Sequence, residues 1–203
     1  MARPDRYVYL RKRGDSVVCS TKPSPLGPLK SRSRARLAAR ALRPDELDHP
    51  TAALKRLHAR LRDLTECRRF EDAARVRDRV QALEDVLRFV NRLERLRQTC
   101  CCLVVPSAET GFARGIFVSA GRIADIRTLA SDLEVDAGLA ACERPGPEDI
   151  DELLLVGTFL RRPPPELRIA RLERAEILRQ AAALPPALMQ TPAPRAPSRA
   201  RAA

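Results

Sequence analysis

Apolar residues in the middle of the chain recur at alternating steps of three and four, in two separate runs. The first run consists of Leu54, Leu57, Leu61 and Leu64, and the second of Ala73, Val76, Val80, Leu83, Leu87 and Val90. This spacing places each run on one face of a helix. The polar break between them, residues 65–69, is short. The pattern therefore predicts an antiparallel helical hairpin within residues 50–99, with the two stripes buried against each other.

After the hairpin, short apolar runs separated by turn residues predict an antiparallel meander of three strands. The runs are residues 101–105, 115–118 and 122–129, and the turns are Glu109-Thr110-Gly111 and Ala120-Gly121. A short helix is expected at 133–142. A second helix opens at Pro147-Glu148-Asp149, with the stripe Ile150, Leu153, Leu154, Gly157 and Leu160. A strand at 167–172 and a helix at 174–183 complete this module, and the Pro, Ala and Arg content from Leu184 onward predicts disorder.

Before the hairpin, residues 6–13 and 16–19 are two short strand-like runs around Gly14-Asp15. Prolines at 23, 25 and 28 interrupt the pattern, and residues 31–42 then predict a short basic helix. The whole pattern indicates an α+β protein that is mostly helical. We expect a basic connector at 1–48, the hairpin at 49–100, a small meander-plus-helices module at 101–184 and a disordered tail at 185–203.

Charge divides the chain in the same places. The 203 residues carry a net charge of +12, and the excess of cations is almost all arginine. The net charge is +7 over residues 1–48, +5 over 49–100, −6 over 101–160 and +6 over 161–203. Arginine favours recognition of phosphate or carboxylate groups. A GC-rich genome also enriches arginine, so the composition leaves both explanations open.

The sequence lacks the marks of a membrane or secreted protein. No apolar run reaches the roughly 18 residues of a membrane span, and no signal-like apolar core follows Met1. We therefore expect a cytoplasmic protein without a membrane partner. Six cysteines in a reducing compartment are expected to be thiols rather than a disulfide framework.

Residues 70–78 carry a specific resemblance. Phe70, Glu71, Ala73, Ala74, Arg77 and Asp78 match the Phe-Glu-x-Ala-Ala-x-x-Arg-Asp core of the UVR motif, and this string resembles the UVR helical hairpin of the bacterial excision nuclease subunits UvrB and UvrC. An unrelated helical pair would share the leucine spacing, but it has no reason to share these offsets. The resemblance implies contact with a UvrB-like protein or another UVR-domain partner. We expect Phe70 to pack back on the first helix near the turn, and Arg77 and Asp78 to fix the hairpin or its partner through charged hydrogen bonds.

A second, weaker resemblance precedes the hairpin. Residues 26–32, Leu-Gly-Pro-Leu-Lys-Ser-Arg, and the basic helix after them are similar to the segment that follows the GIY-YIG nuclease domain in UvrC-like proteins. Its cations are candidates for DNA-backbone contacts: Lys30, Arg32, Arg34, Arg36 and Arg40. They would bind phosphates without reading bases. A solvated basic face is the equally weighted alternative.

Several expected parts of a UvrC-like nuclease are missing from this sequence. Residues 43–50 contain no cysteine, whereas UvrC has an iron–sulfur-binding stretch there, and Tyr7 and Tyr9 lack the glycines, Arg and Glu of a GIY-YIG site. A nuclease domain would lie before Met1. The acids Asp125, Asp132, Glu134 and Asp136 show no exonuclease spacing, and we expect them in a solvated loop.

Metal and cofactor chemistry is likewise not indicated. Cys100, Cys101 and Cys102 adjoin in a strand-like run, so neighbours point to opposite faces and we expect buried thiols rather than a zinc site. His49 and His58 have no ligand partners at suitable spacing, and His58 is expected on an exposed helix face. We expect no catalytic residue, no metal and no cofactor. The favoured function is a UvrC-like DNA repair protein, or its non-catalytic remnant. The alternative is a stand-alone UVR adaptor without a role on DNA.

Overall fold

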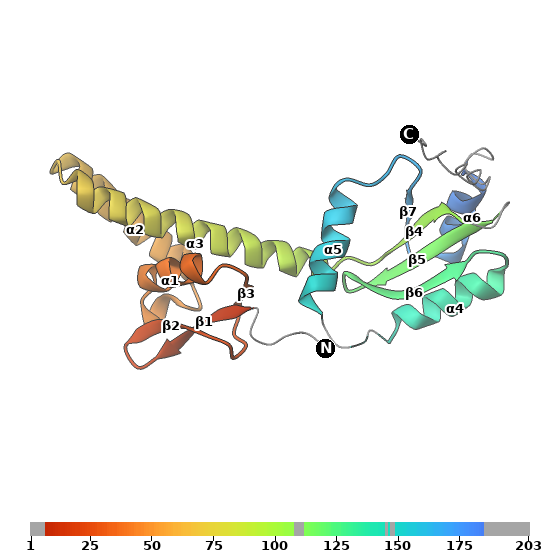
Figure 1. Cartoon of the computed structure of the whole chain (residues 1–203), viewed down its shortest axis with the longest axis horizontal. Coiled ribbons are helices and arrows are strands. Elements are labelled where there is room, and N and C mark those ends of the chain that lie inside the picture. Colours follow the sequence, from red (N-terminus) through yellow and green to blue (C-terminus); the bar gives the residue numbers. More distant parts are fainter. Residues whose placement is uncertain (1–6, 108–111, 145, 147–148, 185–203) are drawn as a thin grey trace, which may run out of the picture. The chain divides into compact units, whose positions relative to one another are not determined.

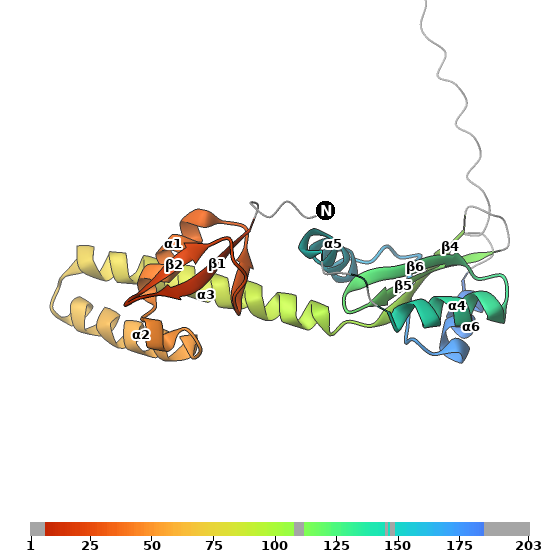
Figure 2. The same ribbon diagram turned by 90° about the horizontal axis from the view of Figure 1, so that it is seen from below.

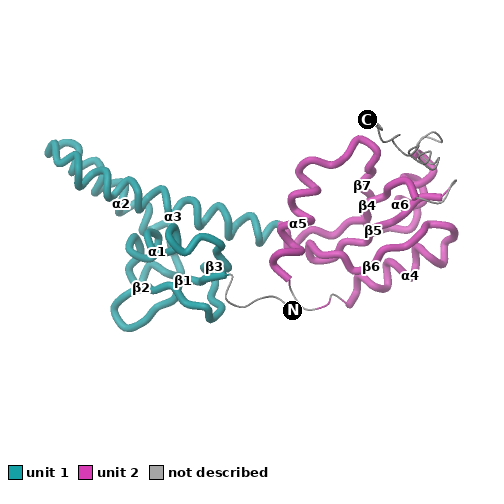
Figure 3. Tube along the Cα trace, in the orientation of Figure 1, with its two compact units in different colours: residues 1–95 teal, residues 96–203 magenta. Residues whose placement is uncertain are grey.

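A computed structural model of the chain describes residues 7–107, 112–144, 146 and 149–184. The α+β fold class is confirmed: helices and two small antiparallel sheets make up the described residues. The chain divides into two compact units, residues 1–95 and 96–203 (Figure 3). Among the described residues, no helix combines the length and the apolar character needed to cross a bilayer.

The first unit begins with a three-stranded sheet in the order β2-β1-β3 (Figure 1). The predicted hairpin of β1 (Val8–Arg13) and β2 (Ser16–Ser20) is confirmed, with Arg13 opposite Ser16. β3 (Leu26–Leu29) was not predicted, because its glycine and proline read as breakers. It is an edge strand, where proline is tolerated, and a Cβ on Gly27 would lie 2.4 Å from the Tyr9 ring.

Helix α1 (Arg32–Ala41) confirms the predicted basic helix and lies against this sheet. Ser31 caps it, and its side chain accepts a hydrogen bond from the Arg34 amide at 3.3 Å. The alanines of its inner face, Ala35, Ala38, Ala39 and Ala41, are buried and its cations point outward. The short 3₁₀ helix η2 (Pro44–Glu46) then leads to the hairpin.

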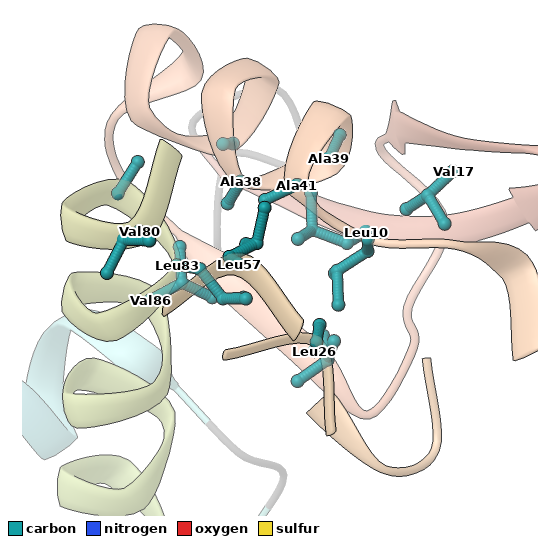
Figure 4. Packing of buried hydrophobic residues seen from close by; sticks show 14 of the residues in the cluster. Leu10, Val17, Leu26, Ala38, Ala39, Ala41, Leu57, Val80, Leu83 and Val86 are labelled. Carbon is teal, nitrogen blue, oxygen red and sulfur yellow. The ribbon is translucent and has the colours of Figure 1, made fainter. Parts of the chain in front are cut away.

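The helical hairpin is formed by α2 (Pro50–Glu66) and α3 (Phe70–Arg97). The two predicted stripes form most of its buried face, with Leu57, Leu64, Ala73, Val76, Val80 and Leu83 all buried. Further along α3, Val86 and Leu93 are buried whereas Leu87 and Val90 are half-buried. Figure 4 shows that residues of the hairpin, α1 and the first sheet share one hydrophobic core. The described part of the expected connector, residues 7–48, therefore packs with the hairpin within one unit.

The second unit contains the predicted meander, with β4 (Cys101–Pro106), β5 (Ala113–Ser119) and β6 (Arg122–Thr128). The predicted last strand, β7 (Arg168–Ala170), pairs antiparallel with β4, so the sheet order is β6-β5-β4-β7. The expected turn at Glu109-Thr110-Gly111 lies outside the described residues.

Three helices cover this sheet. α4 (Asp132–Cys142) and α6 (Arg174–Ala182) lie on one face, and α5 (Ile150–Arg161) lies on the other (Figure 2). A Cβ on Gly138 would lie 2.3 Å from the Phe117 ring, so this glycine lets α4 approach the sheet closely. α5 begins one turn later than its expected opening, with Asp149 as the N-cap. Pro147, Glu148 and the expected disordered tail at 185–203 lie outside the described residues.

Candidate functional site

The turn between α2 and α3 is closed by backbone hydrogen bonds. The Arg69 amide donates to the Leu64 carbonyl at 2.8 Å, and the Arg68 amide donates to the Thr65 carbonyl at 3.0 Å. This is the Schellman pattern, in which a left-handed residue ends the helix. Arg68 occupies that position with φ of 56°. Residues 67–70 are all exposed, so the tip of the hairpin presents a well-defined surface.

Phe70 lies on this tip, and the expectation that it packs back on the first helix is wrong. Its exposed fraction is 65%. Phe70 is in phase with the buried stripe that starts at Ala73, but α2 ends at Glu66, and the last buried residue of α2 is Leu64. The stripe thus continues beyond the end of the helix that would cover it, and a large aromatic side chain is left facing solvent.

The other residues of the UVR-like string divide into an inner and an outer set. Ala73 is buried and Ala74 is half-buried, which allows the two helices to approach next to the turn. Glu71, Arg77 and Asp78 are exposed. The Arg77 guanidinium donates to Asp78 at 3.4 Å, and Asp72 accepts from the Arg69 Nε at 2.9 Å. Phe70 and Glu71 therefore stand together on an outer surface flanked by ion pairs.

The five candidate DNA-backbone cations all have exposed side chains: Lys30, Arg32, Arg34, Arg36 and Arg40. Four lie on α1 and Lys30 immediately precedes its N-cap. Arg34 forms an ion pair with Asp85 of α3, which also pairs with Arg88. The Lys30 ammonium lies 6.0 Å from the centre of the Tyr7 ring. The fold thus gathers these cations on α1 and just before it, and Asp85 partly neutralises Arg34.

The acidic residues of the second unit are not in a solvated loop as expected. Asp125 lies on β6, and Asp132, Glu134 and Asp136 lie on α4. Arg127 contacts Asp125 at 2.6 Å and Glu134 at 2.9 Å. Arg174 binds Asp136 through its Nε at 2.8 Å. These carboxylates are therefore engaged by arginines, and no group of three or more metal-binding side chains occurs within the described ranges.

Two of the three adjacent cysteines are buried as expected. Cys102 faces the core beneath α4 and α6, and Cys101 faces the core beneath α5, so the two thiols do point to opposite faces. Burial raises the pKa of Cys101 to about 11 and that of Cys102 to about 12. Cys100 differs from the expectation, because it is exposed. His58, expected on an exposed face, is half-exposed, and its Nε2 lies 3.8 Å from Glu84 Oε1.

Sequence reasoning missed one surface, the outer side of α5. Leu155 and Phe159 lie off the stripe that this helix buries, and both are exposed. The signal was present in the sequence, because residues 150–160 contain more apolar side chains than one buried stripe requires.

Comparisons of this chain with protein-family models, curated proteins and solved structures found no match.

Proposed function

We propose that this chain is a UvrC-like DNA repair protein, or the non-catalytic remnant of one, that acts by protein contacts of its helical hairpin and by DNA-backbone contacts of α1. The protein partner is a UvrB-like protein or another protein with a UVR hairpin. The chain itself supplies no catalytic residue in this proposal. The UVR-like string at residues 70–78 supports it, together with the position of that string on the structure.

The observation that carries the proposal is the exposure of Phe70 at the hairpin tip. An exposed aromatic side chain on a hydrogen-bonded turn has little conformational freedom left to lose on binding. It is therefore well suited to anchor a partner. Arg69 and Asp72 next to it form an ion pair, which would provide a polar rim. The two alanines that follow set the helix spacing but do not reach this surface.

Calorimetric titration of the full chain with an isolated UVR hairpin of a UvrB-type protein tests the partner contact. Loss of a central aromatic anchor typically costs about 2 kcal/mol or more, which is at least a tenfold weaker Kd, so Phe70→Ala should reduce binding by that factor. Phe112→Ala is the matched control, because Phe112 is an exposed phenylalanine of the second unit. Equal binding by wild type and Phe70→Ala would refute the assignment.

The proposed DNA contact rests on the exposed cations of α1. Phosphate contacts of this kind are independent of sequence, and they weaken as salt rises because bound counterions are released. Arg34 is paired with Asp85, and we expect that pairing to weaken its contact with phosphate. Each phosphate contact on duplex DNA contributes about −0.9 to the slope of log K against log salt, so five contacts predict a slope of about −4.5.

Fluorescence anisotropy with a labelled duplex tests this contact. Replacing Lys30, Arg32, Arg34, Arg36 and Arg40 by Ala should abolish binding and its salt dependence. The control variant has five exposed arginines of the second unit replaced by Ala, and it should keep most of the affinity. These residues are Arg114, Arg144, Arg161, Arg171 and Arg179. Equal losses in the two variants would indicate nonspecific attraction by net charge. An absence of DNA binding together with a retained hairpin contact would favour the stand-alone adaptor.

A further inference from the structure

A pocket of about 200 Å³ lies between α3 and the segment that leads into α1. Its walls come from residues 29–31 and Arg34 on one side and from Asp85, Val86 and Phe89 on the other. Val86 is buried and Phe89 is half-buried, and most of the pocket surface is apolar. An apolar cavity of about 150 Å³ in a protein can bind benzene. This pocket is therefore large enough for one aromatic ring.

Positive charge surrounds the mouth of the pocket. Lys30 and Arg34 line it and are exposed. Asp85, in the wall, forms ion pairs with both Arg34 and Arg88. These three cations and one carboxylate have a net charge of +2. A guanidinium has five N–H donors, so an arginine held by one carboxylate keeps donors for a second anion. Asp85 thus holds two guanidinium groups next to the pocket.

An uncharged aromatic ring joined to an anionic group matches both features. The Asp85 carboxylate would repel a phosphate inside the pocket, whereas Phe89 in the wall can stack on a base. Phosphates would stay at the mouth beside Lys30 and Arg34, which belong to the cations of the proposed DNA contact. Sites for single-stranded nucleic acid combine these two elements, with aromatic side chains for the bases and cations for the backbone.

We propose that this pocket binds one unpaired base of single-stranded DNA, stacked on Phe89, while the adjoining phosphates contact Lys30, Arg34 and Arg88. A base within a duplex is paired and stacked on its neighbours, and taking it out of the stack costs free energy. The pocket therefore favours a single strand over a duplex. This inference rests on the DNA contact proposed for α1 and adds to it the form of DNA that is bound.

Fluorescence anisotropy of the full chain with two short single strands tests the pocket. One strand is normal, and the other has the same backbone with every base missing, so both carry the same phosphates. Stacking of one base on an aromatic side chain strengthens binding by about tenfold. Wild type should therefore bind the normal strand about tenfold more tightly than the base-free strand. Equal affinity for the two strands would overturn the inference.

Substitutions of Phe89 test the role of its ring. Phe89→Leu keeps an apolar side chain but removes the ring, and it should lower the affinity for the normal strand by about tenfold. Phe89→Tyr keeps the ring and should retain most of that affinity. Phe159→Leu is the matched control, because Phe159 is an exposed phenylalanine of the second unit. Undiminished binding of the normal strand by a folded Phe89→Leu would show that no base stacks there. If Phe89→Leu does not fold, the comparison of the two strands on wild type still decides.

Duplex binding separates this inference from the proposed function. The duplex contact uses the cations of α1 and no base, so Phe89→Leu should bind a duplex as wild type does. Duplex binding together with equal affinity for the two single strands would refute the pocket alone. If wild type binds neither a duplex nor a single strand, the proposed DNA contact fails and the pocket assignment fails with it.

Discussion

Arg56 holds Glu46 through two parallel hydrogen bonds, from Nε to Oε1 and from Nη2 to Oε2, both at 2.7 Å. Glu46 is only 8% exposed, and its second oxygen also accepts from the Arg43 amide at 2.8 Å. Arg56 in turn donates to the Ala41 carbonyl at the end of α1. This pair therefore ties α1 and η2 to α2 and fixes the basic helix on the hairpin.

Removing the arginine of this pair should destabilise the first unit. Arg56→Ala leaves Glu46 charged and nearly buried without its main partner, which typically costs about 3 kcal/mol. Urea unfolding measured by circular dichroism should show that loss. Arg60→Ala, an exposed change on the same helix, should change stability by less than about 0.5 kcal/mol. A similarly small change for Arg56→Ala would mean that the pair of Arg56 and Glu46 does not stabilise the unit.

The same pair predicts a loss of stability in acid. Hydrogen bonding by Arg56 is the main cause that lowers the pKa of Glu46, against the opposing effect of burial. A lowered folded-state pKa means that the stabilisation is fully present above the unfolded-state pKa, about 4.3. It declines as the pH falls through the folded-state pKa. The melting temperature of wild type should therefore fall more steeply below about pH 4.3 than that of Glu46→Gln, and parallel curves would contradict this cause.

Phe70 and Leu83 should respond differently to truncation although they share one helix. Phe70→Ala should change the free energy of unfolding by less than about 0.5 kcal/mol, because the side chain is exposed. Leu83 is fully buried, and Leu83→Ala should cost about 3 kcal/mol. Denaturant unfolding of the two variants measures both values. A large loss for Phe70→Ala would show that this side chain packs within the protein after all.

The cysteines should differ in their reactivity toward a thiol reagent. Only the thiolate reacts, and burial raises the pKa of Cys101 and Cys102 to about 11 and 12. Both should stay unmodified at pH 8 in the folded protein and react on denaturation. Cys67 and Cys100 are exposed and should be labelled first. Mass spectrometry of labelled peptides identifies the sites, and rapid labelling of Cys102 would show that the sheet opens.

We expect that this chain by itself does not cut DNA. Phosphodiester hydrolysis needs an activated water and positive charge at the developing oxyanion, usually from carboxylate-held metal. Here Asp125, Glu134 and Asp136 are engaged by Arg127 and Arg174. Supercoiled plasmid incubated with the purified protein and magnesium or manganese should remain intact. Nicking that disappears when one of these carboxylates is replaced would overturn this expectation.

Local patterns were sufficient to predict most elements. Helix and strand periods depend on neighbouring residues alone, so the stripes of α2 and α3 and the meander of β4 to β6 could be read directly. β3 could not, because glycine and proline normally interrupt a strand, and only pairing with β1 at the sheet edge makes them acceptable there. The ion pair of Glu46 with Arg56 was also invisible, because its partners lie ten residues apart on different elements.

For the candidate sites, the sequence alone determined the UVR-like string at residues 70–78 and the run of cations on α1, since both are matters of residue type and spacing. Tertiary structure decided what each side chain faces. The offsets of the UVR-like string led us to expect Phe70 against the first helix, but burial requires an opposing surface, and α2 ends before it can provide one. Leu155 and Phe159 of α5 also lack an opposing surface, because the sheet covers only one side of that helix. A single helix carries the pattern, but exposure depends on where its neighbours end.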